Sequence, residues 1–173
     1  MPFFTLINVS LFTLLRYPSA EITAFEPDPE NALLLREVLR RNGVDHGVEL
    51  IEACAATEDG WLRFATGNGC ESRVDSDGEA RAEARDVFPY LCGVDLLKID
   101  IEGADFLALR GFDFTKYRPE LAMIEYMDSR SGQNFGYTHH DVAKFMAERD
   151  YATYVSEWKA IEHYAVEGQP GEQ

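Results

Sequence analysis

The stretches Ile22-Thr-Ala-Phe-Glu-Pro-Asp-Pro-Glu-Asn31 and Leu96-Leu-Lys-Ile-Asp-Ile-Glu-Gly-Ala-Asp105 decide the fold. Each begins with apolar residues typical of a buried strand and ends in carboxylates. Ligands of α/β sheets bind at the carboxyl ends of the strands, so an acid that ends a strand lies at the rim of a pocket. A third strand-like run, Val48–Ala56, separates the two stretches. This arrangement indicates a binding site for a nucleotide-like ligand.

Strand-like and helix-like segments alternate along the chain. Proline removes a backbone donor, so Pro27 ends one strand, and Pro29 suits the first turn of a helix that we expect to reach Arg41. The other expected elements are a strand at Phe3–Ile7, a helix at Ser10–Tyr17 capped by Ser10, strands at Ile22–Phe25, Val48–Ala56, Leu96–Ile101 and Leu121–Tyr126, a helix at Thr138–Arg149, and a β pair at Ala152–Trp158 and His163–Glu167. This pattern predicts a three-layer α/β sandwich in one domain over residues 1–167, followed by a disordered tail over 168–173.

The composition limits the classes of function. The chain has 173 residues, enough for one domain with a proper core, and a formal net charge of −15. No lysine and arginine cluster is present, which excludes a general nucleic-acid surface because phosphate backbones require clustered positive charge. The apolar run Pro2–Leu15 is too short to span a bilayer and no other run is long enough, so we expect no membrane partner. Cys54, Cys70 and Cys92 match no zinc pattern and are interpreted as free thiols of a reducing, cytoplasmic compartment.

Glu26 is the first candidate for a functional residue. It follows the strand Ile22–Phe25, and an acid at this position of a nucleotide-binding unit typically accepts hydrogen bonds from ribose hydroxyls. The alternative is a solvated acid before a proline turn. We favour the functional interpretation because Phe25 is expected to be buried and Pro27 fixes the direction of the chain.

Asp100 and Glu102 are the next candidates, and we name both as catalytic. They lie two residues apart at the end of a strand, so they share a face while Ile101 points the other way. Two such carboxylates could hold a metal, orient a hydroxyl or raise each other's pKa, or Glu102 could cap the helix that follows. Of these alternatives we expect no metal site.

Two further residues are candidates for the same pocket. Glu125 follows the apolar residues of Leu121–Tyr126 and is expected at the same rim as Asp100. His139 begins a helix after Thr138, and an imidazole near a helix N-terminus tends towards the neutral form, which suits a general base. We name His139 as the third catalytic candidate. The alternative is that His139 is an ordinary surface histidine.

Together these motifs resemble the FkbM-like family of S-adenosylmethionine-dependent methyltransferases. The matching residues are Leu11-Phe-Thr-Leu-Leu15, Ala24-Phe-Glu-Pro-Asp-Pro-Glu-Asn31, Asn42-Gly43, Ala53–Gly60, Asp95–Glu102 with Gly103-Ala104, and Leu109-Arg-Gly111. The likeness covers roughly residues 8–127. It implies a Rossmann-like class I methyltransferase fold with a mostly parallel seven-stranded sheet and an antiparallel C-terminal strand. It also implies methyl transfer to oxygen, often to a hydroxyl of a sugar or a secondary metabolite.

The resemblance implies roles for particular residues. Glu26, followed by Pro27, would hold the ribose hydroxyls of S-adenosylmethionine. Ala55 and Ala56 would flank the adenine, and Asp100 would face the methionine end or the acceptor.

The chain departs from the family at the first loop. Family members usually have an Asp-x-Gly-Ala-Asn-x-Gly type sequence there, whereas this chain offers Phe4-Thr-Leu-Ile-Asn8-Val-Ser10, in which only Asn8 matches. This alignment assigns Asn8 and Ser10 to the cofactor site and puts Leu6 where the methionine part should lie, because glycine normally allows the close approach there. We interpret the chain as a truncated relative with a replaced start, or as a fold that has lost cofactor affinity.

The leading hypothesis is an S-adenosylmethionine-dependent O-methyltransferase acting on a hydroxyl of a small molecule or saccharide. The alternative is a catalytically impaired binding or scaffold domain that keeps the fold. A different Rossmann-like enzyme is disfavoured because no G-x-G-x-x-G occurs in the chain. The sequence does not identify the acceptor, and it is compatible with a homo-oligomer.

Overall fold

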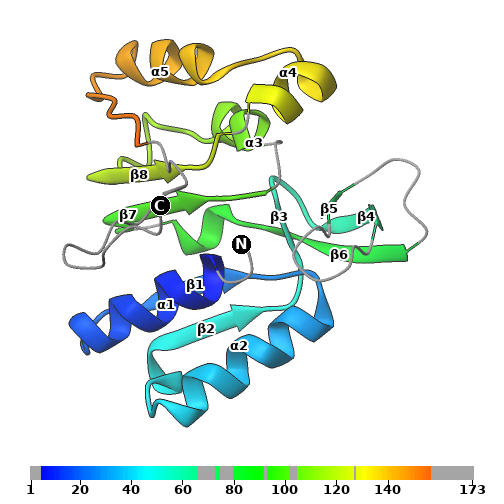
Figure 1. The fold of residues 1–173 in the computed structure, drawn as a ribbon, viewed down its shortest axis with the longest axis vertical. Coiled ribbons are helices and arrows are strands. Elements are labelled where there is room, and N and C mark those ends of the chain that lie inside the picture. Colours follow the sequence, from blue (N-terminus) through cyan, green and yellow to red (C-terminus); the bar gives the residue numbers. More distant parts are fainter. Residues whose placement is uncertain are drawn as a thin grey trace, which may run out of the picture.

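The computed structural model describes residues 5–65, 73–74, 80–91, 93–101, 105–126 and 128–156, which form a mixed α/β structure (Figure 1). The helices are α1 (Thr5–Arg16), α2 (Pro29–Arg41), α3 (Asp105–Gly111), α4 (Asp128–Phe135) and α5 (His139–Ala147), with 3-10 turns at Asp45–Gly47 and Phe88–Tyr90. The strands are β1 (Ile22–Phe25), β2 (Val48–Ile51), β3 (Cys54–Ala56), β4 (Gly60–Ala65), β5 (Arg73–Val74), β6 (Ala80–Asp86), β7 (Leu96–Ile99) and β8 (Leu121–Ile124).

The first half of the molecule is built on β1 and β2. The two strands are parallel, and their register pairs Ile22 with Val48 and Phe25 with Ile51. Helices α1 and α2 supply most of the buried side chains of this half, which are Ile7, Leu14, Ala24, Leu35 and Leu39. The result is an aliphatic core that lies against β1, the strand that leads to Glu26.

Helix α2 confirms the prediction of a helix from Pro29 to Arg41. Asp28 is its N-cap, and the Asp28 side chain accepts hydrogen bonds from the backbone N–H groups of Glu30 at 2.9 Å and Asn31 at 3.4 Å. At the other end Gly43 has a φ of +69°, which glycine adopts without strain. The helix therefore begins shortly after Glu26 in the sequence, and its N-cap fixes the segment that follows β1.

The second half is built on the parallel strands β7 and β8, whose register pairs Leu96 with Leu121 and Ile99 with Ile124. Its buried cluster is rich in aromatic rings and consists of Phe106, Leu109, Phe114, Tyr137, Val142 and Met146. These residues come from α3, from the segments before β8 and α5, and from α5 itself. This core therefore depends on contacts between parts of the chain that are far apart in sequence.

The run Val48–Ala56 is not the single strand that we expected. The backbone N–H of Ala53 donates to the carbonyl of Ile51 at 2.9 Å, and this tight turn interrupts the strand. Before the turn β2 pairs with β1, and after it β3 pairs with β6 in a different sheet. The strand-like composition of the run gave no sign of the turn, because alanine and cysteine suit both sheets.

The expected seven-stranded sheet is not seen among the described residues. The strands form three separate sheets, with the orders β1-β2, β3-β6-β4-β5 and β7-β8. The antiparallel pairs are β4 with β5 and with β6, in the four-stranded sheet. Residues 152–156 form no strand, and the remainder of the expected C-terminal β pair lies outside the described residues. The mixed α/β class is thus confirmed, and the single continuous sheet is not.

The N-terminal segment is helical where we expected a strand and a loop. Helix α1 begins at Thr5, so the expected strand at Phe3–Ile7 is wrong over Thr5–Ile7, and Ser10 lies inside the helix rather than at its cap. Ile7, Ser10 and Leu14 recur at helical spacing and are 8%, 1% and 1% exposed. A strand would put Ile7 and Ser10 on opposite faces, whereas a helix buries both.

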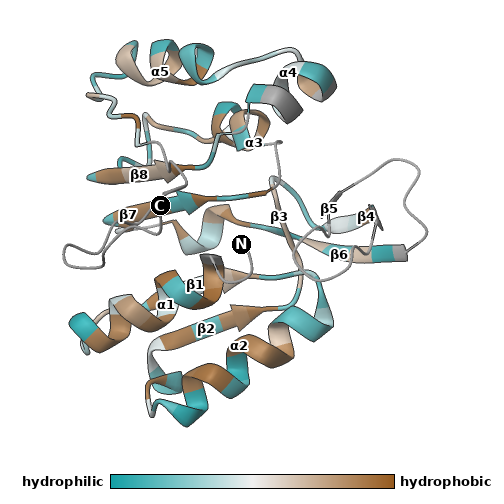
Figure 2. Cartoon of the chain, viewed as in Figure 1, coloured by the Kyte–Doolittle hydropathy of each residue, from teal (hydrophilic) through white to brown (hydrophobic). Residues whose placement is uncertain are grey.

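Figure 2 shows apolar residues on β2, β8 and the first part of β7, a composition typical of parallel strands, although Leu96 and Leu121 are exposed. Among the described residues, no helix combines the length and apolar character needed to cross a membrane.

Candidate functional site

Glu26 is held at the carboxyl end of β1 by its backbone and by its side chain. Its backbone N–H donates to the carbonyl of Ile51 at 3.0 Å, which extends the pairing of β1 with β2 by one residue. Its Oε1 accepts a hydrogen bond from the backbone N–H of Asp28 at 2.9 Å. Glu26 is half-buried, so the carboxylate is both oriented and partly withdrawn from solvent.

The surroundings of Glu26 are poorly hydrated. Burial is the largest cause that raises the pKa of Glu26 above 4.5; the charge of Asp28 acts with it, and hydrogen bonds from the Asp28 backbone and the Asn31 side chain act against it. Cys54 is buried, and desolvation together with the charge of Glu26 raises the pKa of its thiol to about 11. A hydroxyl that donates to Glu26 would therefore make a stronger hydrogen bond than it makes in water.

Asp100 follows β7 directly and forms an ion pair with Lys98. The Lys98 Nζ lies 2.6 Å from Asp100 Oδ2, and the two side chains are only 16% and 17% exposed. The residues are two apart on a strand, so both side chains project from the same face. The cation offsets the desolvation of the carboxylate and fixes its direction.

The pairing of β7 with β8 puts Asp100 and Glu125 at one rim. Ile99 pairs with Ile124, so Asp100 and Glu125 are the next residues of the two strands. The backbone N–H of Glu125 donates to the carbonyl of Ile99 at 3.0 Å, which continues the ladder. The predicted placement of Glu125 is confirmed. Glu102 lies outside the described residues, and its catalytic role stays a prediction.

His139, at the start of α5, is fixed by Asp128 of α4. Asp128 Oδ2 lies 2.6 Å from His139 Nδ1, and Asp128 Oδ1 accepts the backbone N–H of His139 at 2.8 Å. Desolvation acts to raise the pKa of Asp128, but the hydrogen bonds and the charge of His139 outweigh it and lower the pKa below 3.8. The imidazole also contacts the rings of Tyr126 and His140, with centroids 5.1 Å and 4.0 Å away.

The other predicted cofactor residues lie on two elements. Asn8 and Ser10 belong to α1, where Asn8 is exposed and Ser10 is 1% exposed. Ala55 and Ala56 belong to β3, the strand that leaves the β1–β2 pair, and Ala55 is exposed. The loop that we expected at Phe4–Ser10 is therefore wrong over the described residues, since these are helical. Contacts of these four residues with a cofactor stay predictions.

The strand ends define one side of the molecule. In Figure 1 strands β2, β7 and β8 point the same way, towards β3 and the start of α2, and β1 is parallel to β2. Asp100 and Glu125 follow the ends of β7 and β8, Glu26 follows the end of β1, and His139 of α5 contacts Tyr126 after β8. This is the edge at which α/β proteins bind their ligands.

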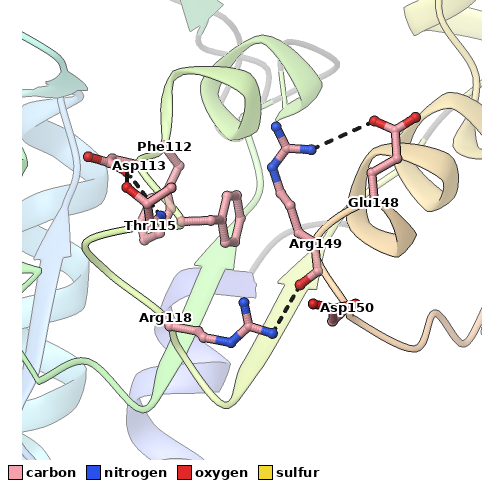
Figure 3. A pocket seen from close by; sticks show the side chains of 8 residues that line it. Phe112, Asp113, Thr115, Arg118, Glu148, Arg149 and Asp150 are labelled. Carbon is pink, nitrogen blue, oxygen red and sulfur yellow. Dashed lines mark hydrogen bonds and ion pairs between the residues drawn. The ribbon is translucent and has the colours of Figure 1, made fainter.

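A cavity of about 650 Å³ opens elsewhere, between the segment before β8 and the C-terminal end of α5 (Figure 3). Arg149 donates to the carbonyl of Phe145 at 2.8 Å, and Arg118 donates to the carbonyl of Arg149 at 3.0 Å. In Figure 3 the two guanidinium groups point away from each other. No described candidate residue lines this cavity, so we interpret it as a junction between helix and strand.

Two residues of the site were missed by the reasoning from sequence. Lys98 was readable, because it lies two residues before Asp100 and must share its face. Asp128 was not readable, because it is separated from His139 by eleven positions and by the unpredicted helix α4. Gly132 and three serine or asparagine residues weaken the helical pattern of this segment.

The fold and these strand ends define an α/β protein with a candidate ligand site at the carboxyl edge of its parallel strands. The family model described as the methyltransferase FkbM domain matches residues 7–153. The chain therefore belongs to the FkbM family of methyltransferases, and the reaction of this family is S-adenosylmethionine-dependent methyl transfer. The search of curated proteins and the search of solved structures each gave no match.

Proposed function

We propose that this protein transfers the methyl group of S-adenosylmethionine to a hydroxyl of a small molecule or saccharide. Family membership supports the methyl transfer, and the hydroxyl acceptor is our inference from the resemblance and from the strand ends. The observation that carries the proposal is the oriented, poorly hydrated carboxylate of Glu26 at the end of β1. The ribose of the cofactor offers two neighbouring hydroxyls, and such a carboxylate is a matching acceptor.

The residues around Glu26 fit the ribose, because the Asp28 backbone and the Asn31 side chain donate to the carboxylate and the group retains further lone pairs. Helix α1 does not fit the methionine part as a glycine loop would, because Leu6 packs against the core cluster of Ile7 and Leu14. We therefore place the methionine end near Asp100 rather than at Asn8 and Ser10. When bound, the cofactor supplies an electrophilic methyl group, and Asp100, Glu125 and His139 would orient the acceptor and take its proton.

The test is a calorimetric titration of S-adenosylmethionine and its demethylated product into wild type, Glu26→Ala and Glu21→Ala. Glu21 precedes β1 at the opposite end of the strand and is exposed, so it is a matched control. We expect Glu26→Ala to weaken binding by about 1.5–3 kcal/mol, the scale of hydrogen bonds to a charged acceptor, and Glu21→Ala to leave it unchanged. Equal affinity of wild type and Glu26→Ala would remove Glu26 from the site.

The acceptor class is tested separately with methyl-labelled cofactor and a panel of saccharides and hydroxylated small molecules. Incorporation of the label into a hydroxyl-bearing compound supports the proposal. Cofactor binding without transfer to any of them, together with transfer to an amine or thiol, would contradict the hydroxyl specificity and leave the methyl transfer itself intact.

A further inference from the structure

We propose that Asp128 and His139 form a dyad in which Asp128 is a positioning residue and Nε2 of His139 is the general base for the acceptor hydroxyl. This inference rests on the proposed function and deepens it, because it names the group that receives the proton and the group that holds it. The sequence gives no indication of Asp128, which the folded chain alone brings to His139.

The two oxygens of Asp128 fix the imidazole completely. One accepts the backbone N–H of His139 at 2.8 Å and the other lies 2.6 Å from Nδ1, so the ring can neither rotate nor flip without losing a hydrogen bond. The pKa of Asp128 is lowered, so its carboxylate is an acceptor only, and Nδ1 must carry the hydrogen. The neutral imidazole therefore has its lone pair on Nε2.

The imidazole of His139 is partly exposed. Among the described residues no hydrogen-bond partner of Nε2 is present, and the side chain of His139 is 29% exposed. The rings of Tyr126 and His140 cover parts of the imidazole faces. The contact with Tyr126 shows where the dyad lies in the fold. Tyr126 follows Glu125, and Glu125 lies next to Asp100 in the continued register of β7 and β8. The imidazole thus lies beside the carboxyl ends of both β7 and β8.

The chemistry balances with these groups. The acceptor oxygen forms a bond to the methyl carbon while the carbon–sulfur bond breaks, and the bonding electron pair goes to sulfur, which becomes neutral. The hydroxyl proton passes to Nε2, and the resulting imidazolium is stabilised by the adjacent carboxylate of Asp128. The proton then leaves to solvent from the partly exposed ring.

Other charged groups surround the dyad and enter any pH dependence. They are His140 and Asp141 of α5, Tyr126 after β8, Tyr137 before α5, and Asp105 of α3, whose charge acts on Tyr137. Asp141 provides the matched control, because its carboxylate accepts from the backbone and hydroxyl of Thr138 and does not contact the imidazole of His139.

The first test needs neither cofactor nor acceptor. Nitrogen-15 NMR spectra of the imidazoles are recorded over a pH series for wild type, Asp128→Asn and Asp141→Asn, with His139→Gln to assign one of the four histidines. We expect His139 to carry its hydrogen on Nδ1 in wild type and in Asp141→Asn. In Asp128→Asn we expect a mixture of tautomers, because the carboxylate that holds the hydrogen on Nδ1 is gone. Hydrogen on Nε2 in wild type, or an unchanged single tautomer in Asp128→Asn, would overturn the dyad.

The second test separates this inference from the proposed function. The affinity for the demethylated cofactor, measured by calorimetry, should be the same in wild type, Asp128→Asn and His139→Gln. Loss of binding in the two variants would show that both residues are structural and would overturn the dyad.

The kinetic measurement uses an acceptor found by the labelled panel. Asp128→Asn should lower kcat by about 10–100-fold with little change in KM, while Asp141→Asn should not. Equal kcat in all three proteins overturns the dyad even if methyl transfer is demonstrated. Absence of cofactor binding in wild type would instead overturn the proposed function while the NMR result stands.

Discussion

Two carboxylates at the same edge of this molecule have pKa values that are shifted in opposite directions. Glu26 follows β1 and burial raises its pKa above 4.5. Asp128, at the start of α4, is also penalised by desolvation, yet contact with His139 lowers its pKa below 3.8. The difference is the partner: Glu26 is hydrogen-bonded by neutral groups beside another acid, and Asp128 faces an imidazole.

This contrast explains how one rim can serve two purposes. A carboxylate surrounded by neutral donors and poor hydration accepts hydrogen bonds readily from neutral hydroxyls, as a ribose requires. A carboxylate that stays ionised beside an imidazole holds one tautomer and stabilises the imidazolium. The same residue class therefore suits recognition at the end of β1 and proton transfer near the end of β8.

The largest expected effect comes from the core beneath one of the two ends. Leu35 of α2 is 0% exposed and lies in the cluster next to β1, so Leu35→Ala should lower the free energy of unfolding by about 2–5 kcal/mol through lost contacts and a cavity. Leu33 on the same helix is 67% exposed, and Leu33→Ala should change stability little. Urea denaturation measures both.

The same denaturation experiment on the second half of the molecule, built on β7 and β8, compares the two cores. Leu109 of α3 is also 0% exposed and belongs to the aromatic cluster, so Leu109→Ala should cost a similar amount. Hydrogen exchange would then report which strand pair each variant loosens. A loss below about 1 kcal/mol for either leucine would show that the cluster around it is not a packed core.

The sequence predicted Glu26 after β1 and Glu125 after β8, but it did not predict Asp128 as the partner of His139, for a physical reason. Glu26 is oriented by Pro27 and Asp28, which are its immediate neighbours, so local rules were sufficient. Asp128 meets His139 only after α4 folds, and no periodic pattern announces a contact over eleven positions. The start of α1 was predicted wrongly although its sequence pattern indicates a helix. Ile7, Ser10 and Leu14 have helical spacing, but the alignment to a glycine loop took precedence.

The division of the sheet could not be predicted from the sequence. The run Val48–Ala56 has the composition of one strand, and whether it turns at Ala53 depends on which partner strand each part meets. Strand pairing is a long-range property, and a short apolar run carries no information about its neighbour.

An intermediate effect is expected at the N-cap of α2. Asp28→Ala removes the acceptor for the backbone N–H groups of Glu30 and Asn31 and should lower the free energy of unfolding by about 1 kcal/mol. Asp28→Asn keeps an acceptor oxygen and should retain most of that stability. If thermal melting ranks the alanine and asparagine variants equally, the cap does not stabilise the segment that orients Glu26.

The smallest and most direct effect is the pH dependence of stability, for which the two carboxylates should have opposite signs. The pKa of Glu26 is raised in the folded state, so its contribution to stability is present below the unfolded value of 4.5 and is lost as the pH rises through the folded pKa. Glu26→Gln removes that loss, so this variant should gain stability relative to wild type as the pH rises from about 4 to 7. The pKa of Asp128 is lowered, so its contribution is present above 3.8 and is lost as the pH falls through the folded pKa. Asp128→Asn should therefore lose stability relative to wild type as the pH rises through that lower window. Because Asp128 is partly exposed, solvent screening keeps its effect modest.

Urea denaturation of wild type, Glu26→Gln and Asp128→Asn at several pH values gives both differences in stability. If the two differences changed with pH in the same direction, the contrast between Glu26 and Asp128 would be refuted.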